Sequence, residues 1–178
     1  MDLDFLTKPP AKLDQSLFLT AKKLKDIDGQ VWTYLVNLIP EGGADFIDNC
    51  LEMLRQISPE LKRYYLTRGF DWERGSDGLK GCVMQDEDDR RLQLTTIAYE
   101  ELGAKEHAQI VRELIPFAKQ RQKAIQEAYQ SGREFDYDDK AFDPFERRWE
   151  AASKKLDFYR VIFKDMKRNP DRYTHPSN

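Results

Sequence analysis

The sequence predicts an all-α protein, a compact single-domain bundle of about seven or eight helices. Apolar residues recur every three or four positions through most of the chain, and no run alternates as the residues of a half-buried strand do. The length of 178 residues suits one domain, and 40% apolar residues with 12% aromatics are too many for a disordered chain. The two ends, residues 1–10 and 170–178, are expected to be flexible.

The first helices follow from apolar spacing and from start signals. One stripe covers residues 13–24 and resumes over residues 31–38, which predicts a helical hairpin or one kinked helix. Another stripe covers residues 46–57. Ser58 suits an N-cap and Pro59 the first helical position, so a short helix is expected to begin there.

The middle of the chain combines a glycine-rich stretch with two helical patterns. Residues 67–81 hold four of the nine glycines and show neither periodicity, so we expect the longest irregular segment there. Helices then follow at residues 92–102, ended by Gly103, and at residues 108–129. Pro116 should kink or split the second of these, because proline lacks a backbone donor and clashes with the preceding turn.

The last helix has the clearest pattern. It opens at Asp143-Pro144, and its apolar residues continue to Met166 at alternating steps of four and three. Such a stripe predicts one helix that packs along its whole length, and Asn169-Pro170 ends it.

The charges of the chain nearly balance. There are 29 basic and 32 acidic residues and a net charge of -3, so we expect no direct binding of nucleic acid and no binding to an anionic membrane. The start is acidic where a secretory signal would be basic and then apolar, and the longest apolar stretch, residues 31–40, is too short to cross a bilayer. These features predict a soluble, cytoplasmic protein.

The sequence carries little that indicates catalysis. It lacks the motifs of a serine nucleophile elbow and of the common phosphate-binding loops. His107 has no Glu three residues before it, as di-iron helical bundles require, and it is expected to have a structural or solvent-exposed role. Cys50 and Cys82 form no C-x-x-C pair and are expected to be buried hydrophobes. We therefore expect no enzymatic activity, no cofactor and no metal.

Two acidic runs stand out, "DEDD" at residues 86–89 and "REFDYDDKAFDPFERRW" at residues 133–149. Neither has the pattern of a calcium-binding EF-hand loop. The first is either a helix-capping cluster or part of a binding surface, and the second is either a solvated loop or such a surface. Its aromatic residues either anchor it to the helices or serve as anchors for a protein partner inside a polar rim. The candidate partner-binding residues are Asp86, Glu87, Asp88, Asp89, Glu134, Asp136, Asp138, Asp139, Asp143 and Glu146.

The strings "GLKGCVMQ" at residues 78–85 and "IAYEELGAKEHAQIVREL" at residues 97–114 resemble the signature of the DNA-mimic protein (Dmp-type) domain family. The matching positions are Gly78, Leu79, Gly81, Leu102, Gly103, Ala104, Ala108 and Ile110. The chain departs from the family at residues 82–85, where aromatics and then Asn are usual, and "EGGADFIDN" at residues 41–49 is a rival site for the glycine motif. The resemblance implies a compact all-α fold and no known catalytic activity. In the best-understood member of the family, a homodimer presents an acidic surface that occupies the DNA-binding face of a transcription regulator.

Three functions remain open on the sequence alone. The leading hypothesis is a non-enzymatic protein-interaction domain, a DNA-mimic-like regulator that presents an acidic surface to a basic DNA-binding protein and forms a homodimer. One alternative is a small-molecule-binding or enzymatic helical domain that uses Trp72, Asp77 and Lys80 of residues 67–81. The other is a bacterial immunity protein, which would carry the same acidic patch but bind a toxin.

Overall fold

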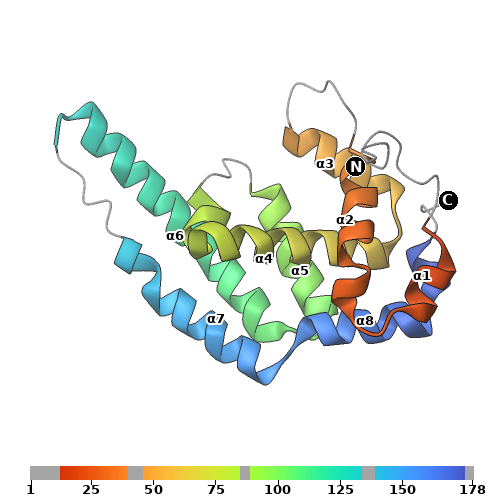
Figure 1. Ribbon diagram of the computed structural model, residues 1–178. Coiled ribbons are helices and arrows are strands. Elements are labelled where there is room, and N and C mark those ends of the chain that lie inside the picture. Colours follow the sequence, from red (N-terminus) through yellow and green to blue (C-terminus); the bar gives the residue numbers. More distant parts are fainter. Residues whose placement is uncertain (1–12, 40–45, 85–88, 134–138, 175–178) are drawn as a thin grey trace, which may run out of the picture. The chain divides into compact units, whose positions relative to one another are not determined.

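The structure is a computed structural model that describes residues 13–39, 46–84, 89–133 and 139–174. These residues form eight α-helices and no strand, so the predicted all-α class is confirmed (Figure 1). Within the same ranges, none of the helices is long and apolar enough to cross a lipid bilayer.

The contacts of the chain divide it into two compact units. Unit 1 comprises residues 1–65 and 158–178, and unit 2 comprises residues 66–157. Helix α4, Pro59–Met84, begins in unit 1 and continues into unit 2. Ser58 caps this helix as predicted, because its Oγ accepts a hydrogen bond from the backbone N–H of Leu61 at 3.2 Å.

Unit 1 brings together the first helices and the last one. It contains α1 (Gln15–Thr20), η2 (Leu24–Asp26), α2 (Asp28–Val36), α3 (Phe46–Gln56), α8 (Phe158–Arg168) and η4 (Pro170–Tyr173). The fully buried ring of Phe18 lies 5.8 Å from that of Tyr173, measured between centroids. The hydroxyl of Tyr64 donates to the Asp28 carboxylate at 2.6 Å and so ties α4 to α2. Residues 170–173, predicted as part of a flexible end, form the 3-10 turn η4, in which Tyr173 is 2% exposed.

Unit 2 is built around a pair of antiparallel helices. Besides the second part of α4 it contains α5 (Arg90–Glu101), α6 (Lys105–Gln130), η3 (Asp139–Phe142) and α7 (Asp143–Lys155). The turn from α5 to α6 passes through Gly103, whose φ of 77° favours glycine, as the predicted helix end requires. Aromatic rings from three helices fill the core. The ring centroid of Trp149 in α7 lies 5.4 Å from that of Phe70 in α4 and 5.5 Å from that of Tyr99 in α5.

The prediction of an irregular segment at residues 67–81 is wrong, because α4 runs through it. Leu66 and Phe70 are buried on one side of Gly75, and Leu79 and Cys82 on the other. The glycines hide this helical stripe, since they interrupt its apolar pattern without adding a side chain that packs.

Only at Gly78 does α4 break. Its φ of 67° and ψ of -175° lie outside the helical region, and the helix restarts at Leu79. Gly78 therefore supplies a conformation that side chains with a Cβ rarely adopt.

Two further helix predictions need correction. The apolar stripe that predicts one helix up to Met166 belongs to two helices, α7 and α8. The chain is extended between them at Leu156, where φ is -136° and ψ is 112°. The buried positions of α8 include Ile162, and Tyr159 and Phe163 are only half-buried, so the apolar stripe shifts by one residue at the break. Of the two outcomes predicted for Pro116, a kink or a split, the split is wrong, because α6 continues through the proline from Lys105 to Gln130. The residue lies on the exposed side of α6, where water can solvate the carbonyl that loses its partner.

Candidate partner-binding site

Three of the ten candidate carboxylates have described side chains. Asp143 is the first residue of α7 and is exposed. Asp89 precedes α5 with its side chain 16% exposed, and it forms an ion pair with Lys119 of α6. Glu146 lies in the first turn of α7 with its side chain 27% exposed. Outside the described residues lie Asp86, Glu87, Asp88, Glu134, Asp136 and Asp138, and for Asp139 only the backbone is described.

Glu146 connects α7 to the break in α4. Its Oε1 accepts a hydrogen bond from the backbone N–H of Leu79 at 2.5 Å, and its Oε2 lies 3.4 Å from Nη1 of Arg74. The carboxylate thus takes the place of an N-cap acceptor where the helix restarts after Gly78. A Cβ at Gly78 would lie only 2.9 Å from Oε1. Glu146 is therefore engaged in holding the fold together.

The described residues that flank the two acidic runs are attached to one short stretch of α6. The side-chain amide of Gln122 donates to the carbonyl of Met84 at 3.0 Å, and Lys119 pairs with Asp89, so both sides of the first run are attached. Within the second run, the ring of Phe142 packs edge-on against Phe117 at 5.2 Å, measured between centroids. Phe142 is 3% exposed and therefore anchors the chain, as one of the two readings of the aromatics expects.

The two attachments lie on different sides of α6. Positions 117 and 119 are two residues apart, which corresponds to roughly 200° around a helix of 3.6 residues per turn. Beyond them α6 extends past α5 (Figure 1), and most of its residues from 119 to 130 are exposed. Tyr129 in this second half is 85% exposed. We name residues 119–130 the distal half of α6.

The cations of the distal half already interact with other residues. Lys119 pairs with Asp89, and Lys123 lies 3.8 Å from a carboxylate oxygen of Glu127. Arg121 also has an interaction partner. Their charges are therefore partly compensated before any partner approaches.

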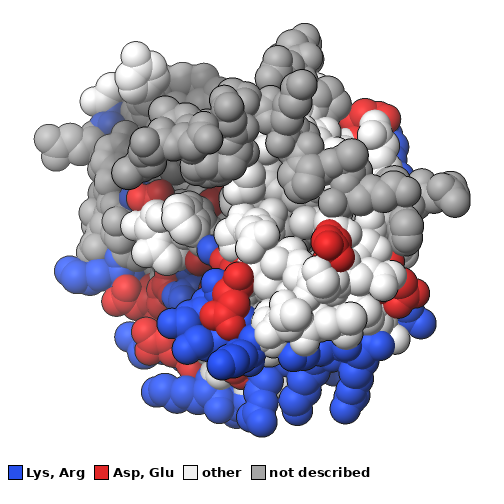
Figure 2. All heavy atoms as spheres, turned by 45° about the vertical axis from the view of Figure 1, so that its right-hand side comes forward, with Lys and Arg blue, Asp and Glu red and all other residues white. Residues whose placement is uncertain are grey.

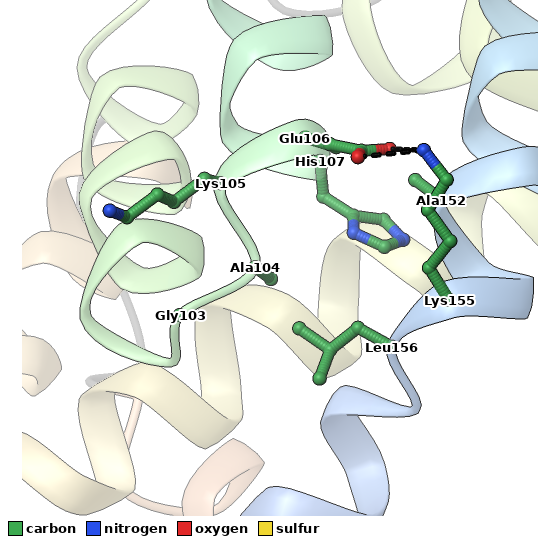
Figure 3. A pocket seen from close by; sticks show the side chains of 8 residues that line it. All are labelled: Gly103, Ala104, Lys105, Glu106, His107, Ala152, Lys155 and Leu156. Atoms are coloured by element: carbon green, nitrogen blue, oxygen red, sulfur yellow. Dashed lines mark hydrogen bonds and ion pairs between the residues drawn. The ribbon is translucent and has the colours of Figure 1, made fainter.

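A groove of about 170 Å³ lies where α6 begins and α7 ends (Figure 3). Its lining includes the small residues Gly103, Ala104 and Ala152, and Nζ of Lys155 and Oε1 of Glu106 meet across its rim at 2.8 Å. The rim charges are thus paired with each other. In the part of the chain that the structure describes, no three His, Cys, Asp or Glu side chains are close enough to hold a metal ion together.

His107 lines this groove but belongs to the core, since it is 1% exposed. Its ring stacks on Tyr99 and packs edge-on against Trp149, at centroid distances of 5.6 and 4.6 Å. Its Nε2 lies 3.0 Å from Oγ of Ser153. Burial lowers the pKa of His107, and the nearby carboxylate of Asp71 partly opposes this shift. The geometry gives the imidazole a packing role and keeps it neutral near pH 7.

The segment proposed for a small-molecule site has a different geometry from the one expected. Trp72 and Asp77 are exposed residues of α4, and the guanidinium carbon of Arg68 lies 5.2 Å from the centre of the Trp72 ring. The loop on which that hypothesis depends is a helix.

Sequence reasoning missed the counter-ions of this unit. Arg91 binds Glu73 through two hydrogen bonds of 2.6 and 2.8 Å, and Arg148 pairs with Glu113 in the same bidentate way. These partners are separated by 18 and 35 residues. No spacing rule in the sequence could have found them, because helix-surface rules cover only pairs three or four residues apart.

Comparison with known proteins gives one match. A family model described as DMP19-like protein matches residues 55–168, from the end of α3 to the end of α8. No curated protein and no solved structure matches the chain.

Proposed function

Because the chain belongs to the DMP19-like protein family, we propose that it acts by binding another protein and catalyses no reaction. The partner is a basic DNA-binding protein, and the binding surface consists of the distal half of α6 together with the carboxylates of the two acidic runs. The proposal includes a homodimer, which sedimentation measurements would test.

The observation that carries the proposal is that described residues in or next to both acidic runs are attached to residues 117–122 of α6. Asp89 and Met84 contact the helix through Lys119 and Gln122, and Phe142 contacts it through Phe117. The attachments lie on different sides of α6, so a partner that surrounds the distal half of this helix would meet the residues next to both. Opposite charge across an interface speeds the encounter and selects partners.

The exposed ring of Tyr129 adds an anchor to this surface. Aromatic side chains at the centre of an interface contribute most of the binding energy, and the surrounding polar rim contributes less. We therefore assign two roles: Tyr129 contributes to the lifetime of the complex, and the carboxylates contribute to the rate at which it forms.

Charge distribution along the chain also supports the proposal. Ten of the 32 acidic residues, but only two of the 29 basic ones, lie outside the described residues. Six of these ten belong to the two acidic runs. The net charge of -3 therefore conceals a strong local excess of carboxylates.

The first test neutralises carboxylates that have no described role in the fold. The variant Asp136→Asn, Asp138→Asn and Asp139→Asn leaves Glu146 and Asp89 in place, since both hold helices together. Proteins captured by the wild-type chain are identified and purified, and the association rate is measured at low and high salt. We expect the variant to associate at least tenfold more slowly at low salt, with a weaker dependence on salt.

A matched control removes three exposed carboxylates elsewhere, through Asp77→Asn, Glu150→Gln and Asp171→Asn. The control changes the net charge by the same amount as the variant, but it should bind like the wild type, because its carboxylates lie outside the proposed binding surface. A DNA-mimic mode also requires that the partner's own DNA displace the chain. Equal association rates for the variant, the control and the wild type would contradict the proposal.

The partner's identity separates the remaining alternatives. A toxin as the captured protein would favour the immunity reading over the regulator. The small-molecule reading keeps little support, because its loop is part of α4 and the rim charges of the groove in Figure 3 are paired.

A further inference from the structure

Helix α8 in unit 1 carries a basic face opposite its buried one. Arg160, Lys164, Lys167 and Arg168 are all exposed and fall within roughly 100° of the helix circumference. The apolar side chains of Phe158, Ile162 and Met166 are buried on the other side. Figure 2 shows Lys and Arg side chains along the lower edge of the face in view.

A second basic segment joins this face from the other end of the sequence. Nζ of Lys167 donates to the carbonyl of Ala21 at 2.7 Å, which brings the turn between α1 and η2 against α8. Lys22, Lys23 and Lys25 follow in that turn, and all three are exposed. We call α8 residues 160–168 together with residues 22–25 the unit 1 basic face.

The carboxylates closest in sequence to this face are occupied elsewhere. Asp165 accepts hydrogen bonds from the hydroxyl of Tyr173 at 2.6 Å and from the amide of Asn169 at 2.8 Å. Asp26 accepts from the backbone N–H groups of Lys22 and Lys23 at 3.1 and 3.0 Å. These acidic groups thus satisfy protein donors, although their charges still lower the local potential.

Among the residues that the structure describes, six cations of the face enter no ion pair: Lys22, Lys23, Lys25, Lys164, Lys167 and Arg168. By contrast, Arg91, Arg148 and Lys155 of unit 2 are each paired with a carboxylate. The described part of unit 1 contains eleven basic and eight acidic side chains. Its positive charge is therefore concentrated on α8 and the turn beside it.

From this arrangement we infer that the unit 1 basic face binds the phosphodiester backbone of a nucleic acid. The two turns from Arg160 to Arg168 span about 12 Å. Each strand of a duplex presents one phosphate per about 3.4 Å of axis, so the face can reach several phosphates at once. Such contacts are independent of base sequence, because the phosphates carry no base identity.

The composition of the face favours nucleic acid over other anionic partners. Lysine is depleted at protein interfaces, which rely on aromatic anchors, and the largest exposed apolar residue of α8 is Val161, at 36%. A membrane-surface helix instead inserts its apolar side into lipid, but that side of α8 is buried in the unit. Lysine and arginine without an apolar anchor are typical of phosphate contacts.

This inference differs from the prediction, made from the net charge of the whole chain, that the protein binds no nucleic acid directly. The value of -3 averages over acidic runs that belong to unit 2, whereas α8 and residues 22–25 belong to unit 1. The inference is also independent of the proposed protein partner, because it uses other residues and is tested with nucleic acid alone.

The experiment measures fluorescence polarisation of a labelled DNA duplex of about 20 base pairs, and of single-stranded RNA of similar length, as the full chain is added. At about 50 mM salt we expect binding that weakens steeply as salt rises, with affinity in the micromolar range or weaker. The variant Lys25→Gln, Lys164→Gln and Arg168→Gln should bind at least tenfold more weakly and flatten the slope of log K against log salt by about 2–3. The duplex and RNA arms show which nucleic acid is bound more tightly.

A control variant removes three exposed cations from unit 2, through Lys105→Gln, Arg147→Gln and Lys154→Gln. It should bind like the wild type, and circular dichroism should show both variants folded. The inference is overturned if the wild type binds neither probe at about 50 mM salt, or if the two variants lose the same affinity. Binding to anionic lipid vesicles without binding to either nucleic acid would also overturn it.

Discussion

The carboxylate of Glu146 in α7 accepts the backbone N–H of Leu79 in α4, although 67 residues separate the two in sequence. This contact places the acceptor of a helix N-terminus on another helix. It also explains why the glycine motif lies where it does, since the chain at Gly78 must turn with a φ of 67° beneath that carboxylate.

Replacing Glu146 with Ala should destabilise the protein by about 1–2 kcal/mol, because a half-buried backbone N–H loses an ionised acceptor. Urea denaturation measures the loss. Glu146→Gln should lose less than half as much stability as Glu146→Ala, since an amide oxygen can still accept the hydrogen bond. Glu150→Ala on the same helix, at an exposed position, serves as the control. A loss below about 0.3 kcal/mol for Glu146→Ala would mean that water replaces the carboxylate without cost.

Two glycines of α4 should respond to alanine in opposite directions. Gly75→Ala should stabilise the protein by about 0.5–1 kcal/mol, because a Cβ there meets nothing within 4 Å. Gly78→Ala should destabilise it by about 1–2 kcal/mol, because alanine strains at positive φ and its Cβ crowds the Glu146 carboxylate. Thermal melting of both variants tests the contrast. Equal shifts of the melting temperature in the two variants would contradict the backbone break at Gly78.

These glycines also show how far sequence reasoning reaches. Local signals act within a few residues, so Ser58 as a cap, Gly103 as a helix end and Asp143 as a helix start could all be predicted. Gly75 and Gly78 look alike in sequence. Only the tertiary contact from Glu146 makes one of them a break and leaves the other inside a helix.

The helix break at Leu156 was hidden for a different reason. Apolar residues continue at helical spacing across it, and nothing in the periodicity marks the point where α7 in unit 2 gives way to α8 in unit 1. The candidate site was predictable in part: the acidic runs are visible in the sequence. The attachment of Phe142, Asp89 and Met84 to α6 depends on long-range packing, which no local pattern encodes.

Both cysteines should resist modification in the folded protein. Burial raises the pKa of the Cys82 thiol, and Cys50 is 3% exposed with its Sγ 3.4 Å from the hydroxyl of Tyr65. The thiolate is the reactive form, so we expect less than one thiol to react with a thiol-specific dye at about pH 8 in native buffer. Both should react once urea unfolds the chain. Rapid labelling of the native protein would place at least one cysteine in an accessible position.

Protonation of His107 should destabilise the fold as the pH falls. Burial lowers the pKa of this histidine below its ordinary value of 6.5, because the charged imidazole loses its hydration among Tyr99 and Trp149. Between the folded and unfolded pKa values the unfolded chain binds more protons. The contribution of His107 to stability is therefore fully present above about pH 6.5 and declines below it. The free energy of unfolding, measured in urea from about pH 7.5 to 5, should fall more steeply for the wild type than for His107→Gln. His175→Gln is the matched control and should follow the wild type, whereas identical slopes for the wild type and His107→Gln would show that other groups cause the decline.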